Sequence, residues 1–148
     1  MNRLSVLDSD LASVLEHMDR ATLSRIAVAA TSEAIRTANF VHPLVGTILH
    51  KLEVGSQIRV TDRESVRLLV EQLDEEQWKL HDVARSQGEQ LRALNAFRKA
   101  RAANALLFAI SDANCLSACE TLYESHAAGV QLETLRSLCQ PEHGIATR

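Results

Sequence analysis

Aromatic side chains are scarce in this chain of 148 residues, where they make up 3% and include one tryptophan and one tyrosine. A hydrophobic core must therefore consist of aliphatic side chains and alanine, which suits closely packed helices. Only five glycines and two prolines are present. The sequence contains neither a phosphate-binding loop nor a dinucleotide-binding fingerprint, so the nucleotide-binding folds that depend on those motifs are excluded.

Cysteine is also rare: there are three, an odd number, and no CxxC motif. Such a set is not a disulfide framework, and it suits a reducing compartment. No uncharged run approaches the roughly 20 apolar residues that a membrane-spanning helix needs. The N-terminal segment lacks the pattern of a secretory signal. We therefore expect a cytoplasmic protein with no membrane partner.

The formal net charge is −3 at pH 7, and charged residues make up 24% of the chain. The basic residues are not in excess, and no aromatic residues are interleaved with them. A nucleic-acid-binding surface needs a concentration of positive charge, so we expect no nucleic-acid partner.

Residues 91–126 carry the longest nearly uninterrupted helical pattern. Apolar residues recur there at spacings of three and four, and alanines fill much of the remaining surface. We expect two packed helices in the middle of the fold. Ser111 or Asp112 is expected to cap the second of these helices, and Gly129 to follow its end.

Similar patterns elsewhere predict further helices, and the expected ones span residues 8–18, 19–39, 43–54, 61–73, 74–84, 86–110, 115–126 and 132–139. Capping boxes are expected to start the helices at Thr61 and Ser86, and a similar motif at Asp74. Residues 56–60 are expected to be an extended connection. The prediction is an all-α fold, a compact irregular or orthogonal bundle of about eight helices, several of them short. Residues 1–140 should form one helical domain and residues 141–148 a flexible tail.

The sequence offers few residues for catalysis. Cys115, Cys119 and His126 share one helix face, and thiolates with imidazole are good zinc ligands. At 1.5 Å per residue they spread over about 16 Å, too far to meet at one ion. We predict core packing for them, with no metal, no cofactor and no catalytic residue. No Glu-x-x-His motif of a di-iron bundle occurs, and we place Glu120 and Glu124 on a solvated face.

Two buried polar side chains are predicted, Asn104 and His126. Asn104 lies within the apolar stripe of its helix, where an amide needs a hydrogen-bonding partner. An interhelical hydrogen bond is the favoured interpretation, and a ligand contact is the alternative.

Charged residues supply the remaining candidates for a functional surface. The acidic run and the basic set that could contact a partner are Asp74, Glu75, Glu76, Arg98, Lys99 and Arg101. Separate patches of opposite sign suit electrostatic matching to a protein partner. The favoured function is a non-enzymatic, bacterial-type protein-binding module, an adaptor or immunity-type inhibitor. The alternative is a small enzyme or small-ligand binder with a site buried between helices, and self-association into a homo-oligomer stays open.

Overall fold

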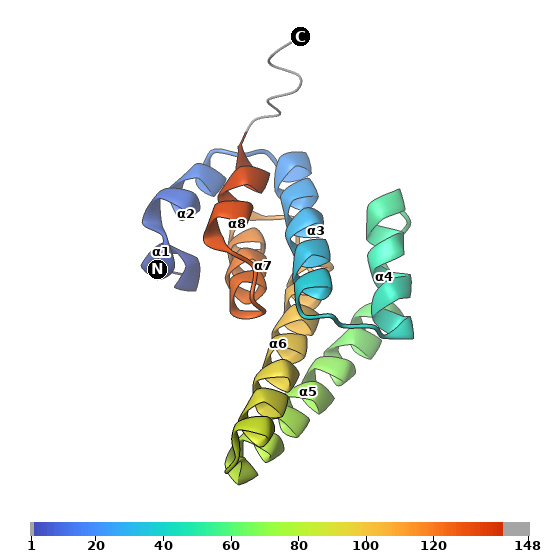
Figure 1. The fold of residues 1–148 in the computed structure, drawn as a ribbon. Coiled ribbons are helices and arrows are strands. Elements are labelled where there is room, and N and C mark those ends of the chain that lie inside the picture. The colour runs from blue at the N-terminus through green and yellow to red at the C-terminus, as the bar shows by residue number, and fades with distance from the viewer. Residues whose placement is uncertain (1, 141–148) are drawn as a thin grey trace.

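The computed structural model describes residues 2–140, over which the chain forms eight helices and no strand (Figure 1). The helices are α1 (Arg3–Leu7), α2 (Ser9–Glu16), α3 (Arg20–Thr37), α4 (Pro43–Val54), α5 (Val60–Val83), α6 (Gln87–Ala109), α7 (Cys115–Ala127) and α8 (Leu132–Cys139). The prediction of an all-α bundle is confirmed over this range. The tail predicted at residues 141–148 lies outside the described residues.

The core lies where α3, α6 and α7 pack together, and α1, α2 and α8 cover α7 and α3. It is aliphatic and rich in alanine, as the scarcity of aromatics requires. Its fully or almost fully buried members include Leu4, Leu15, Ile26, Ala30, Ala34, Ile48, Ala100, Ala102, Ala103, Leu106, Leu122 and Leu135. Alanine at the helix crossings lets the helix axes approach closely.

Helices α5 and α6 form a long antiparallel hairpin whose far end projects away from the rest of the bundle (Figure 1). The chain reverses at Ser86, whose hydroxyl accepts a hydrogen bond from the Glu89 backbone N–H, at 3.1 Å. The Glu89 carboxylate accepts one in return from the Ser86 N–H, at 3.0 Å. This is the capping box that the sequence predicts, and it fixes where α6 begins.

The predicted break at Asp74 is wrong, because α5 continues from Val60 to Val83. No glycine or proline lies inside that range to stop a helix, and the Asp74 carboxylate binds Arg101 of α6 instead of capping backbone. The helix predicted to begin at Thr61 begins one residue earlier, at Val60. Asp62 accepts a hydrogen bond from the Arg59 N–H, at 2.9 Å, so Val60 is already helical.

The helix predicted at residues 8–18 corresponds to α2, which ends at Glu16, and a short helix that was not predicted, α1, precedes it. Asn2 caps α1 by accepting a hydrogen bond from the Ser5 N–H, at 2.8 Å, and Asp8 ends α1 and caps α2. At α7 the cap is Asn114 rather than Ser111 or Asp112. Serine, aspartate and asparagine can all cap a helix, so spacing alone does not choose between neighbouring candidates.

Gly129 follows α7 as predicted, with a φ of +116°. A Cβ atom there would lie 3.2 Å from the Thr37 side chain and 3.6 Å from Nε of Arg98. The missing side chain therefore allows the turn after α7 to pack against both α3 and α6.

Asp8, between α1 and α2, binds Arg136 of α8 and so links the first and last helices of the described chain. Its carboxylate is also expected to make the stability of the fold depend on pH. Its pKa is held below the ordinary value because the carboxylate accepts a hydrogen bond from the Leu11 N–H, at 3.1 Å, and one from Nε of Arg136 in α8, at 2.8 Å. A depressed folded-state pKa contributes stability that is present above about pH 4 and is lost as the pH falls further.

We therefore expect the free energy of unfolding to drop more between about pH 4 and pH 2 for the wild type than for Asp8→Asn, since asparagine keeps the cap but cannot titrate there. Urea denaturation at several pH values measures this. Equal acid sensitivity of the two proteins would show that Asp8 contributes nothing to the pH dependence.

Candidate functional site

A carboxylate lies at the centre of the contact between α6 and α7. Glu124 of α7 is fully buried, with 0% of its surface exposed. Nη1 of Arg101 donates to both of its oxygens, at 3.1 and 2.9 Å, and Nδ2 of Asn104 donates to Oε2, at 2.5 Å. A buried charge is tolerated when it is paired and hydrogen-bonded in this way. The amide of Asn104 thus makes the interhelical hydrogen bond that the sequence favours.

Glu124 and its neighbours form a charge cluster that connects four helices. Nη2 of Arg101 donates to Asp74 of α5. Arg3 of α1 binds Glu120 and lies 3.6 Å from Glu124. Its guanidinium also stacks over the Tyr123 ring, 4.3 Å from the ring centroid.

The predicted solvated face at Glu120 and Glu124 is wrong. Glu124 is buried and the Glu120 side chain is only 15% exposed. Glu124 lies with Thr121 and Ala128 at helical spacings of three and four, and all three are buried. That spacing was a usable signal, but a glutamate is almost never fully buried unless it is paired, and the pairing with Arg101 is visible only in three dimensions.

Within the charge cluster, the Glu124 carboxylate has little remaining capacity to accept hydrogen bonds from a ligand. Both carboxylate oxygens already accept hydrogen bonds from Arg101 or Asn104. The cluster therefore serves to hold α1, α5 and α6 against α7, and it sets which residues of α6 face which residues of α7.

The acidic run and the basic set lie on neighbouring helices and are linked by an ion pair. Asp74 and Arg101 pair with each other, and only 18% of the Arg101 side chain is exposed. Glu75 pairs with Lys79 at 3.1 Å. Glu76 is exposed. Arg98 and Lys99 are half-buried. The acidic residues thus lie along α5 and the basic ones along α6, on the two arms of the same hairpin.

The two buried thiols, Cys119 and Cys139, lack the pKa shift that activates a cysteine nucleophile. The Sγ atoms of Cys115 and Cys119 lie 3.9 Å apart, and burial raises the pKa of the Cys119 thiol to about 12. Burial also raises the pKa of Cys139, to about 11. A nucleophilic cysteine needs the opposite shift. Nδ1 of His126, a half-buried side chain, lies 2.9 Å from the Val130 carbonyl oxygen. Within residues 2–140, no three His, Cys, Asp or Glu side chains are arranged to hold a metal ion.

The far end of the hairpin carries an open groove of about 500 Å³ between α5 and α6. Trp78, the only tryptophan, lies in it with 60% of its surface exposed, and Leu94 is 42% exposed. The Trp78 ring meets the His81 ring edge to face, with 6.2 Å between centroids. The residues that line this hairpin groove are Gln77, Trp78, His81, Ala84, Gln90, Ala93, Leu94 and Phe97.

Contacts join the hairpin groove to the charge cluster. Phe97 lines the groove, and the Arg101 guanidinium lies over its ring, 5.7 Å from the centroid. Arg101 in turn binds Glu124. In the sequence, Trp78 and Leu94 look like ordinary members of amphipathic helical stripes. Spacing cannot show that their faces lack a covering helix.

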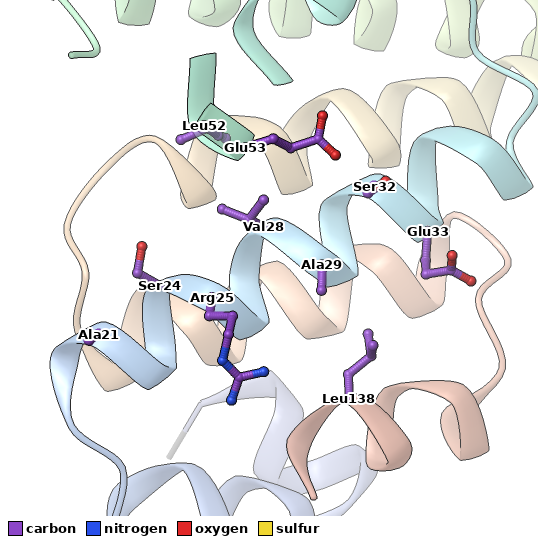
Figure 2. Close-up of a pocket in the computed structure, with 10 residues that line it drawn as sticks. All are labelled: Ala21, Ser24, Arg25, Val28, Ala29, Ser32, Glu33, Leu52, Glu53 and Leu138. Atoms are coloured by element: carbon purple, nitrogen blue, oxygen red, sulfur yellow. The ribbon is translucent and has the colours of Figure 1, made fainter. Parts of the chain in front are cut away.

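A second hollow lies over α3, between α4 and α8, and has a volume of about 600 Å³. Figure 2 shows Val28 facing Leu52 and Glu53 of α4, with Arg25 on the side of α3 nearer to Leu138 of α8. Its floor consists largely of small side chains of α3. It is shallow and presents no large apolar side chain comparable to Trp78, so we regard the hairpin groove as the stronger candidate.

The chain matches no protein-family model, no curated protein and no solved structure, so no known function can be transferred to it. In the described part of the chain, none of the helices is both long enough and apolar enough to span a membrane.

Proposed function

We propose that this protein is a binding module that recognises another protein through its hairpin groove and carries out no chemistry of its own. One observation carries the proposal: Trp78 and Leu94 remain substantially exposed in a groove at the projecting end of α5 and α6. Tryptophan is the residue type most enriched at the energetic centres of protein interfaces. An exposed apolar patch with polar surroundings typically marks an interaction site.

The surroundings of the groove also favour a protein over a small molecule. The groove is open along the hairpin, whereas small-ligand sites usually enclose most of their ligand. Charged residues such as Glu76 and Arg98 neighbour its lining residues along α5 and α6, and many interfaces have such a polar rim around an apolar centre. An adaptor or an immunity-type inhibitor would use such a projecting surface. The charge cluster between the helices offers little to a ligand, because the Glu124 carboxylate is already hydrogen-bonded within the chain.

The test uses three tagged proteins expressed in the organism that encodes the chain: wild type, Leu94→Glu and Leu116→Glu. Leu94 lines the groove, while Leu116 is a similarly exposed leucine on α7 and serves as the matched control. A charge at the centre of an apolar interface should abolish binding. We expect the same defined protein to copurify with the wild type and with Leu116→Glu, and to be lost with Leu94→Glu.

The candidate partner is then purified and mixed with each variant in size-exclusion chromatography. Coelution that depends on Leu94 supports the proposal. A partner that binds all three variants equally would show that the groove is not the binding surface. Turnover of a small molecule by the isolated protein would show that the module is an enzyme.

A further inference from the structure

The hairpin is covered unequally along its length. Helix α7 packs beside α6 and meets it at Arg101 and Asn104, through Glu124. Helix α7 ends at Ala127, whereas α6 extends beyond that level toward the tip of the hairpin, where it begins at Gln87. The hairpin groove lies on this extension, next to Phe97 and Leu94. Two antiparallel helices are therefore left there without the third helix that covers α6 nearer the core (Figure 1).

We propose that the occupant of the hairpin groove is a single amphipathic helix of a partner protein, with acidic residues along one edge of its apolar stripe and basic residues along the other. This inference rests on the proposed function and specifies the partner. A helix that lies between α5 and α6 would complete a three-helix layer and bury Trp78, Leu94 and Phe97, which is the usual outcome when a helix docks in a groove.

The charges of α5 and α6 indicate that the two edges of the partner helix carry opposite charge. From residue 71 to residue 82, α5 carries one lysine against the acidic residues Glu71, Asp74, Glu75, Glu76 and Asp82. From residue 90 to residue 101, α6 carries no acidic residue, and its basic residues are Arg92, Arg98, Lys99 and Arg101. Glu71, Asp74 and Glu75 form ion pairs with Arg67, Arg101 and Lys79. The groups outside these pairs are Glu76 and Asp82 on α5 and Arg92, Arg98 and Lys99 on α6, and they give the two arms opposite charge. A helix between them is attracted most when its edges differ in charge.

The groove also limits the length of the occupant. Its lining residues on α6 run from Gln90 to Phe97, about 11 Å along the helix axis at 1.5 Å per residue. Those on α5 run from Gln77 to Ala84, a similar length. The contact therefore takes about two to three turns of a partner helix, which places its anchors at i, i+3 or i+4 and i+7.

The experiment uses three synthetic helical peptides with the same leucine stripe. One has glutamates along one edge and lysines along the other, the second has glutamates along both edges, and the third has lysines along both. Trp78 is the only tryptophan, so its fluorescence reports occupation of the groove directly. We expect the mixed-edge peptide to shift Trp78 emission to the blue and to bind about fivefold or more tightly than either single-charge peptide. The preference should shrink at high salt.

Leu94→Glu should abolish the emission shift, and Leu116→Glu should leave it intact. Equal affinity of all three peptides would overturn the charge-matched helix, as would the absence of any shift. A blue shift that appears when the protein alone is concentrated would also overturn it, because the occupant would then be a second copy of this chain. These failures are distinguishable from failure of the proposed function: a host protein that needs Leu94 for binding would still support protein recognition by another kind of partner surface.

Discussion

Replacing Arg101 by methionine is expected to lower the free energy of unfolding by about 3 kcal/mol, because the substitution leaves the buried Glu124 carboxylate without its main cationic partner. Arg3 compensates incompletely, since it lies 3.6 Å from Glu124 and is itself half exposed. Chemical denaturation of the variant and the wild type at neutral pH measures this loss.

A double variant separates charge from packing in this prediction. In Arg101→Met combined with Glu124→Leu both charges are gone, so stability should recover much of the loss. Asn104→Leu removes only one hydrogen bond to Glu124 and should cost less than Arg101→Met. Additive effects of the two single substitutions at 101 and 124 would show that the pair is not coupled, and the structural role assigned to the charge cluster would be wrong.

The second large effect is expected in the aliphatic core. Leu122 of α7 is fully buried, and Leu122→Ala should cost about 2 to 5 kcal/mol through lost burial and the cavity left behind. Leu116→Ala on the same helix is the control, since that side chain is 62% exposed and its loss should change stability by less than about 0.5 kcal/mol. Urea denaturation of both variants is the measurement. Equal losses would mean that α7 packs in a different register.

Local signals in the sequence account for much of the fold. The Ser86 capping box and the glycine after α7 lie where the spacing of polar residues and apolar stripes predicts them. These features depend on residues within one helical turn, so a single sequence contains the information. The break predicted at Asp74 failed for the same reason: a capping motif looks the same whether its aspartate binds backbone or an arginine on a neighbouring helix.

The site was much less predictable. Arg101, Asn104 and Asp74 were singled out as charged or polar residues, but spacing does not show that Arg101 and Asn104 bind Glu124, 23 and 20 positions away, or that Arg101 also binds Asp74, 27 positions away. Leu94 and Trp78 belong to amphipathic stripes like those of every other helix. Whether such a stripe is covered depends on where α7 ends relative to α6, which no local pattern encodes.

The position of α1 and α2 has a consequence for how the chain is made. Leu4, Leu11 and Leu15 are buried, both α1 and α2 pack against α7, and α2 also packs against α8. The ion pairs Arg3–Glu120 and Asp8–Arg136 join these parts of the chain. A ribosome synthesises α1 and α2 more than 100 residues before the helices that cover them. At about 5 to 20 residues per second, their leucines stay uncovered for roughly 5 to 20 seconds of translation. Transiently exposed apolar surface favours aggregation, and α1 and α2 can reach their native packing only after α7 and α8 have been synthesised.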